Sequence, residues 1–352
     1  MEPLRAAFIS PGIGDGCGGG APFFRFAARS LGKFCDETLL LDPVSYPVAA
    51  HSGFRHEVVR TSADVIASVE AYEADLVIKA SGALAGDEDF KLDLALSAHM
   101  QSRGKRLIYL DVDAPSRLPL LAYLPQVYLR ELAEADHAVV VVGGGFRAES
   151  LYRGMGFVRT LRLQAVAAYE GVCWDPATGL YRDVPSLGRN EHSVASLYVP
   201  TDPRFEQSQL LLSDARSAGL SVTEPASTSG GVENDQWLRV LAGSRACLCL
   251  LRDDVRGFDD NPSARVFEAI FSGSLVLTEA IDGMSSYLPV EFRSEIPKDV
   301  DEWITLRDKL NGRIESSLAA ARAFARRSAD AQAAEFISFV RKNMISYSPT
   351  YS

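Results

Sequence analysis

Short apolar runs alternate with amphipathic stretches along the first half of the chain. Residues 62–74 place apolar side chains at helical spacing. Runs of strand length lie at 6–10, 38–42, 75–80, 106–111, 137–142 and 160–165. This alternation predicts parallel strands joined by helices, which is the pattern of a doubly wound α/β domain.

The same alternation resumes in the second half after a break that is rich in glycine and proline. There it predicts strands at 196–199, 220–223 and 246–251, and helices at 205–217 and 233–242. From about residue 300 the pattern predicts consecutive helices without a strand. We therefore expect an N-terminal domain over 1–168, a linker over 169–192, a C-terminal domain over 193–315 and C-terminal helices over 316–352.

Composition limits the classes of protein to consider. The 352 residues suffice for two cores, and 47% hydrophobic and 23% charged residues are ordinary for a globular protein. The net charge of -10 argues against nucleic acid or an anionic membrane as a partner. No apolar run reaches about 18 residues and no leader pattern opens the chain, so we expect a cytoplasmic protein without a transmembrane segment.

The segment 252–278 carries the clearest site pattern. Asn261 can cap a short helix that ends at Gly273. Arg265 and Glu268 fall on the side opposite the apolar residues, so we expect both on the outside of this helix. A helix N-terminus with an arginine favours a phosphate, and a carboxylate one turn later can accept two ribose hydroxyls. From spacing alone, an exposed Arg/Glu pair on an ordinary helix is an equal alternative.

This segment resembles the donor-binding segment of GT-B glycosyltransferases of group 1, and particularly of their CgeB-like branch. The residues that match the family pattern are Pro262, Arg265, Phe267, Glu268, Ala269, Gly273 and Thr278. The resemblance implies an α/β protein of the GT-B fold, with two Rossmann-like doubly wound domains facing a cleft. The N-terminal domain would bind the acceptor and the C-terminal domain the nucleotide sugar, with the C-terminal helices crossing back onto the first domain.

The resemblance also implies roles for single residues on the donor side. Glu268 would hold the ribose, and Asp260 would position the transferred sugar as one catalytic residue. Asp260 stands eight positions before Glu268, where the family usually has Glu, so the carboxylate is displaced by one methylene. The full donor-binding set is Arg252, Asn261, Ser263, Arg265, Glu268 and Gly230. Gly230 would lie in a small-residue loop under the donor, and a plain surface turn is an equal alternative for it.

On the acceptor side, two segments follow predicted strands. The glycine-rich run 11–20 would face the cleft with Gly14, Asp15 and Gly16 as acceptor-binding residues. Its alternative is a dinucleotide-binding turn, for which Asp42 alone could serve as the ribose-binding acid.

The second acceptor segment begins where the strand at 106–111 ends. A similar Asp-x-Asp-x-Pro stretch faces the cleft in CgeB-like proteins, so Asp111 would bind the acceptor and Asp113 would act as general base. The alternative is a structural role in which Asp111 caps the strand end and Asp113 starts a turn.

The sequence thus predicts a glycosyltransferase, hexosyltransferase-like, that moves a sugar from a nucleoside diphosphate sugar to a small-molecule, glycan or peptide acceptor. We expect no metal and no cofactor, because Arg265 and the helix N-terminus would neutralise the leaving diphosphate. The resemblance of the acidic pair to that of the family implies retention of configuration. Two alternatives are a GT-B nucleotide-sugar epimerase and a non-catalytic GT-B binding protein; the unusual Asp260 favours the second. The sugar, the base, the acceptor and the oligomeric state stay open.

Overall fold

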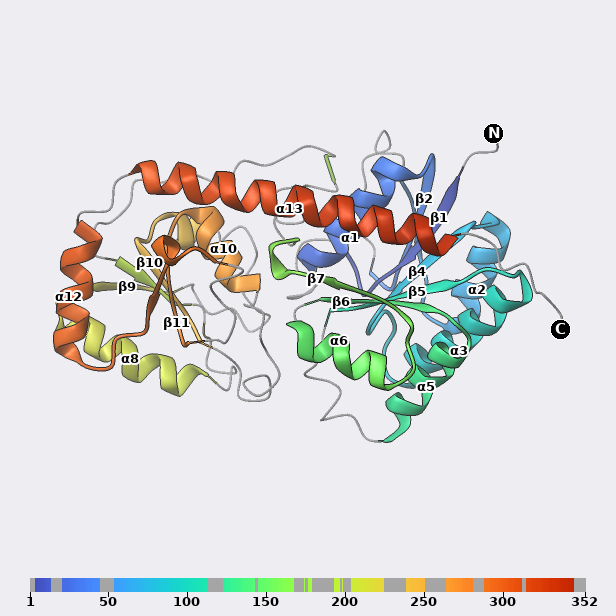
Figure 1. Cartoon of the computed structure of the whole chain (residues 1–352), viewed down its shortest axis with the longest axis horizontal. Helices are drawn as coiled ribbons and strands as arrows, with labels where there is room; N and C mark the ends of the chain where they lie inside the picture. The colour runs from blue at the N-terminus through green and yellow to red at the C-terminus, as the bar shows by residue number, and fades with distance from the viewer. Residues whose placement is uncertain are drawn as a thin grey trace. The chain divides into compact units, whose positions relative to one another are not determined.

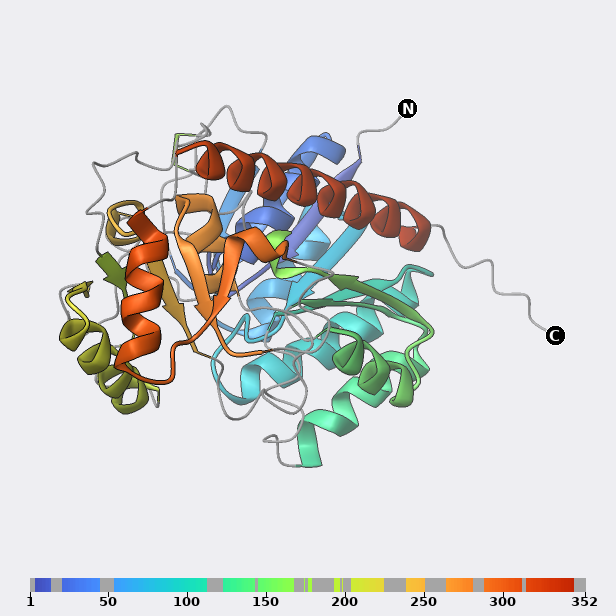
Figure 2. The ribbon, with the colours of Figure 1, turned by 60° about the vertical axis from the view of Figure 1, so that its left-hand side comes forward.

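The chain divides into two compact units. Unit 1 comprises Met1–Tyr181 and Asp330–Ser352, and unit 2 comprises Arg182–Ala329. Within each unit a parallel sheet is covered by helices (Figures 1 and 2). The computed structural model describes residues 4–13, 21–44, 54–112, 123–142, 145–167, 174, 177–178, 193–196, 198, 204–224, 239–250, 264–280, 288–311 and 315–344. Among these residues, no helix has both the length and the apolar character that a membrane span requires.

In unit 1 the described residues form a seven-stranded parallel sheet of order β3-β2-β1-β4-β5-β6-β7. Its elements are β1 (Arg5–Ile9), α1 (Ala21–Phe34), β2 (Glu37–Asp42), β3 (Phe54–Val58), α2 (Ser62–Tyr72), β4 (Leu76–Ala80), α3 (Asp87–Ser102), β5 (Leu107–Asp111), α5 (Tyr123–Glu134), β6 (Ala138–Val142), α6 (Gly145–Gly154), β7 (Arg159–Leu163) and the 3-10 turn η1 (Ala165–Ala167). Strands β4, β5 and β6 are buried along their whole length, which explains their continuous apolar runs. Side chains of α2, α3, α5 and α6 pack with one face of the sheet into a single core.

Unit 2 holds a five-stranded parallel sheet of order β12-β11-β10-β8-β9 among its described residues. Its elements are β8 (Ser193–Ala195), α8 (Phe205–Ser217), β9 (Ser221–Thr223), β10 (Ala246–Cys249), α10 (Ala264–Ser272), β11 (Leu275–Thr278), the 3-10 turn η2 (Val290–Phe292), β12 (Arg293–Glu295) and α12 (Val300–Asn311). Helices α8 and α12 pack together on one face of the sheet, where Trp303 is fully buried.

Helix α13 (Glu315–Met344) contributes to both units, since unit 2 ends at Ala329 and unit 1 resumes at Asp330. Its C-terminal half packs on α1, where Phe336 lies 5.7 Å from Phe26 between ring centroids and the Arg341 guanidinium lies 4.8 Å from the centre of the Phe34 ring. Figures 1 and 2 show α13 as one long helix.

The predicted fold class is confirmed, with corrections to single elements. Strand β3 was not predicted, because Arg55, His56 and Glu57 make it polar; as an edge strand it is only partly buried. The short edge strand β12 also lacks an apolar run. The strand predicted at 196–199 was wrong in position, since β8 lies at Ser193–Ala195. Most of the predicted helix 233–242 lies outside the described residues.

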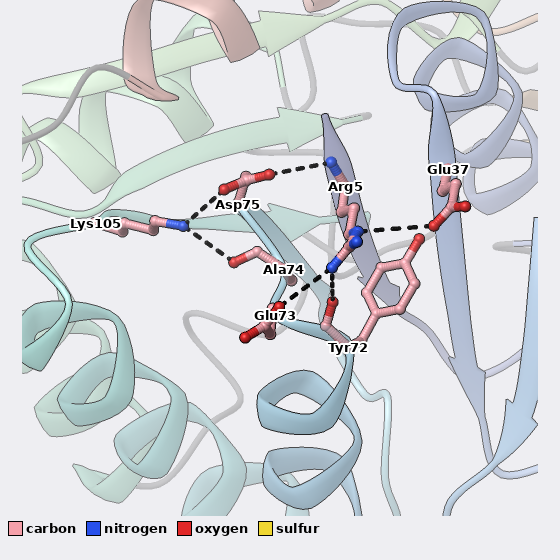
Figure 3. Close-up of polar contacts among 7 residues, drawn as sticks. All are labelled: Arg5, Glu37, Tyr72, Glu73, Ala74, Asp75 and Lys105. Atoms are coloured by element: carbon pink, nitrogen blue, oxygen red, sulfur yellow. Dashed lines mark hydrogen bonds and ion pairs between the residues drawn. The ribbon is translucent and has the colours of Figure 1, made fainter. Parts of the chain in front are cut away.

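Charged side chains form ion pairs between elements of unit 1 at the end of the sheet where the strands begin (Figure 3). Arg5 opens β1, and its guanidinium lies 3.4 Å from Glu73 and 3.8 Å from Glu37. Asp75 accepts a hydrogen bond from the Arg5 backbone N–H at 3.2 Å and pairs with Lys105 at 3.0 Å. Burial alone would raise the pKa of Asp75, but the hydrogen bonds from Lys105 and Arg5 together with their charges lower it. These pairs hold neighbouring strands together at this edge.

Candidate functional site

Helix α10 carries Arg265 and Glu268, the two predicted donor residues that fall within the described ranges. It packs Val266, Phe267, Ile270 and Phe271 into the interior. It ends as expected at Gly273, whose φ of +78° is the left-handed conformation that glycine adopts without strain. There the Gly273 N–H donates to the Ile270 carbonyl and the Ser274 N–H to the Ala269 carbonyl, both at 2.8 Å. The strand β11 follows at once, so the helix is short and fixed at its C-terminal end.

The expectation that Glu268 lies outside was wrong. Its residue is only 8% exposed, and Ala269 and Ser272 on the same side of α10 are fully buried. The alternative of a solvated Arg/Glu pair therefore does not describe Glu268, because a buried carboxylate must be compensated by other polar groups. The backbone of Arg265 lies in the first turn of α10, while its side chain is outside the described residues.

The residues that follow β10 are hydrogen-bonded to those that follow β8, and these two strands are neighbours in the sheet. The Tyr198 hydroxyl accepts a hydrogen bond from the Leu250 N–H and donates one to the Leu250 carbonyl at 3.3 Å. Arg204 also donates to that carbonyl at 3.3 Å, and its guanidinium lies 4.8 Å from the centre of the Tyr198 ring. In unit 2 the chain runs outward in opposite directions from β8 and β10, so this is the switch point at which open α/β sheets bind ligands.

In unit 1 the switch point lies between β1 and β4, and a buried polar cluster stands beside it. Ser10 follows β1, and its hydroxyl donates to Asp42 at the end of β2. The second Asp42 oxygen lies 3.4 Å from His56 Nε2, and the Asp42 residue is 1% exposed. Because both oxygens of Asp42 contact protein groups in the interior, the structure disfavours the dinucleotide alternative, which requires this carboxylate for a ribose.

Asp111 ends β5 and is buried, with 4% exposure. Its carboxylate accepts a hydrogen bond from the hydroxyl of Tyr152, a fully buried residue of α6. The Val112 N–H that follows donates to the Ser81 hydroxyl at 3.3 Å. In these contacts Asp111 fixes the end of the strand, which is the structural role left open by the sequence.

Sequence reasoning missed a buried charged cluster in unit 1. Lys79 on β4 is fully buried and lies 2.9 Å from Asp89 and 2.8 Å from Asp93, both on α3. A signal was present, because a lysine within an apolar strand and two aspartates four residues apart on a helix are each costly unless paired. His137, by contrast, is the structural residue that its lack of neighbouring ligands suggested: its Nδ1 accepts from the Leu107 N–H at 3.0 Å and its Nε2 lies 2.9 Å from the Ser97 hydroxyl.

The remaining predicted site residues lie outside the described residues, namely Gly14, Asp15, Gly16, Asp113, Gly230, Arg252, Asp260, Asn261 and Ser263. Within the described ranges, no group of three or more His, Cys, Asp or Glu side chains could hold a metal ion. The two described carboxylates of the prediction, Glu268 and Asp111, belong to different units.

Comparisons with known proteins agree with this architecture. Residues 210–337 match the family model described as glycosyl transferase-like. No curated protein sequence matches the chain. Several solved structures match over nearly the whole length, and three of them serve as examples. Anabaena Alr3699/HepE in complex with UDP-glucose has 13% identity and a TM-score of 0.54, over 95% of this chain and 99% of that one.

A glycosyltransferase from Rickettsia africae has 11% identity and a TM-score of 0.59, over 98% of this chain and 99% of the other. T4 phage BGT in complex with its substrate UDP-glucose also has 11% identity, with a TM-score of 0.56, over 97% of this chain and 99% of that one. The chain has the GT-B fold. In GT-B terms, unit 2 contains most of the segment that matches the glycosyl transferase-like family, and α10 lies within it. The resemblance to GT-B glycosyltransferases is confirmed, and the narrower CgeB-like branch stays a prediction.

Proposed function

We propose that the protein transfers a sugar from a nucleoside diphosphate sugar to an acceptor hydroxyl. The match of residues 210–337 to a glycosyl transferase-like family carries the proposal. Two solved structures of the same fold support it, since both Anabaena HepE and T4 phage BGT were crystallised with UDP-glucose. A uridine diphosphate hexose is therefore the first donor to test, and the acceptor is a small molecule, glycan or peptide.

Within this proposal, unit 2 binds the nucleotide through α10. Glu268 is a buried carboxylate on α10, and buried ionisable groups concentrate at functional sites. It holds the ribose hydroxyls. Arg265 in the first turn and the helix N-terminus neutralise the diphosphate. Arg252, Asn261, Ser263 and Gly230 complete the donor side.

The chemistry proposed is metal-independent and retaining. Charge that develops on the leaving diphosphate is stabilised by Arg265 and backbone N–H groups instead of a divalent ion. Asp260 positions the sugar and Asp113 takes the proton of the acceptor hydroxyl, while the loop with Gly14, Asp15 and Gly16 contacts the acceptor.

A transfer assay tests the proposal against its two alternatives. The protein is incubated with UDP-, GDP-, ADP- and dTDP-hexoses, with and without EDTA, in the presence and absence of a set of sugar and peptide acceptors. Nucleoside diphosphate release that depends on an acceptor, with one hexose added to that acceptor, is the expected result. Release of nucleotide and an altered free sugar without any acceptor indicates the epimerase, and absence of turnover indicates the binding protein. Asp113→Asn should abolish transfer, whereas the exposed Asp87→Asn should not.

A further inference from the structure

Thr278 ends β11 with a buried hydroxyl group. The residue is 3% exposed, and within the part of the chain that the structure describes its Oγ1 has no hydrogen-bond partner. A buried hydroxyl without a partner costs free energy, because it has given up its hydrogen bonds to water. Valine has nearly the same shape and would avoid this cost. A polar group of a bound ligand would remove it as well.

The position of Thr278 in the sheet distinguishes it from another buried hydroxyl of the same kind. Thr38 has no exposed surface and no partner for its hydroxyl among the described residues, and it is the second residue of β2, where the strands of unit 1 begin. Thr278 is the last residue of β11, at the carboxyl edge of the unit 2 sheet and beside β10, which borders the switch point. Ligands of open α/β sheets bind beyond this edge. Position therefore favours a ligand contact for Thr278 and not for Thr38.

The register of the strands places the Thr278 side chain on one particular face of the sheet. Thr278 pairs with Cys249 on β10, and residues that pair in parallel strands direct their side chains to the same face. Leu248 and Leu250, on either side of Cys249, belong to the core that α8 and α12 cover, so Cys249 and Thr278 lie on the opposite face. The β10–α10–β11 connection runs in the opposite direction to β8–α8–β9, and right-handed crossovers then place α10 on this opposite face.

The first turn of α10 stands at the same edge of the sheet as Thr278. A helix that connects two parallel strands runs back along them, so α10 starts from the carboxyl end of β10. It ends at Ser272, three residues before β11 begins at Leu275. The free N–H groups of its first turn favour a phosphate. The N-terminus of α10 and the unpartnered hydroxyl of Thr278 thus share one edge and one face of the sheet.

We propose that Thr278 is a donor-binding residue, whose hydroxyl donates a hydrogen bond to a phosphate oxygen of the nucleoside diphosphate. A hydrogen bond from a hydroxyl to a charged oxygen is roughly twice as strong as one between neutral groups. It satisfies the buried hydroxyl, and it gives the diphosphate donors from β11 in addition to those of α10. The inference rests on the proposed function, because it assigns one more contact to the same donor site.

The first test compares the stability of Thr278→Val and Thr38→Val by urea unfolding without nucleotide. Thr38→Val is the matched control, because it removes an equally buried, unpartnered hydroxyl from the other unit. Neither variant should be less stable than the wild type, since valine removes a polar group that has no partner to lose. A loss of stability in Thr278→Val that Thr38→Val does not show would mean that the Thr278 hydroxyl already bonds within the protein, and it overturns the inference.

The second test is calorimetric titration of the same variants with UDP, GDP, ADP and dTDP, each as its ribose and its 2′-deoxyribose form. For the nucleotide that the wild type binds, Thr278→Val should lower the affinity roughly tenfold, and Thr38→Val should leave it unchanged. The loss should be the same for the ribose and the deoxyribose form, because the missing bond is to a phosphate.

The outcomes separate this inference from the proposed function. Wild-type affinity in Thr278→Val, an equal loss in both variants, or a loss confined to the ribose form overturns the phosphate contact of Thr278 and leaves the proposed function in place. A wild-type protein that binds none of these nucleotides overturns both.

Discussion

The Tyr198 hydroxyl hydrogen-bonds both the N–H and the carbonyl of Leu250, and so joins the exits of two neighbouring strands of unit 2. Both residues are buried, so neither backbone group has water as a substitute partner. The segment that carries Arg252, Asp260 and Asn261 begins directly after Leu250. The position of Leu250 therefore decides where the proposed donor segment starts.

Tyr198→Phe should weaken nucleotide binding without preventing folding. It leaves the buried N–H of Leu250 without the hydroxyl, which costs about 1–3 kcal/mol of unfolding free energy. We expect nucleotide affinity to fall roughly tenfold, measured by calorimetry, because the start of the donor segment is less well fixed. Tyr152→Phe is the matched control: it removes a buried hydroxyl in unit 1 and should leave nucleotide affinity as in the wild type. Equal affinity losses in the two variants would refute this specific role for Tyr198.

His137 should make the fold sensitive to acid. Burial lowers its pKa to about 4, below the ordinary value of 6.5, so the neutral ring is the form that the folded state accepts. Stability from this group is fully present above pH 6.5 and is lost as the pH falls toward 4. His137→Leu removes the acceptor for the Leu107 N–H, so at pH 7.5 it should be less stable by about 1–3 kcal/mol.

The test for His137 is urea unfolding of wild type and variant at several pH values. The difference in unfolding free energy should shrink between pH 6.5 and pH 4.5, because only the wild type has to keep a histidine neutral. Asp93 has the opposite effect on the absolute stability, because burial raises its pKa to about 6 and its ionisation then destabilises the folded state. The difference in unfolding free energy between variant and wild type is therefore the informative quantity. A difference that stays constant over this range would show that His137 is charged or solvated in the folded state.

The ion pairs at the end of the unit 1 sheet where the strands begin should affect only stability, and only slightly (Figure 3). Asp75→Asn weakens the pair with Lys105, and because both groups are partly exposed the loss should stay below about 1 kcal/mol. The loss should decrease further in high salt, which screens exposed charges. Thermal unfolding at low and high salt measures it. A substantial fall in nucleotide affinity in Asp75→Asn would contradict the assignment of function to the edge where the strands end.

The regular spacing of apolar runs made the fold predictable, and there is a physical reason why β3 and β12 were missed. β4, β5 and β6 are buried on both faces and read as apolar runs in the sequence. β3 and β12 are edge strands that need no apolar run, so their composition does not distinguish them from loops.

The candidate site was less predictable than the fold. Helical periodicity places Glu268 opposite the apolar residues, but periodicity describes only the helix's own faces and not what covers them. The Lys79 cluster joins residues from β4 and α3, and only the tertiary structure brings these together. Tyr152 meets Asp111 across 41 positions of sequence for the same reason.

The central claim is that α10 holds a nucleoside diphosphate without a metal ion, and calorimetric titration tests it most directly. Wild type, Glu268→Gln and the exposed control Glu206→Gln are titrated with UDP, GDP, ADP and dTDP, each with and without EDTA. We predict that one nucleotide binds with a Kd on the order of micromolar, that EDTA leaves this unchanged, and that Glu268→Gln alone weakens it at least about tenfold. Absence of binding by all four nucleotides, or equal affinities in wild type and Glu268→Gln, would contradict the account.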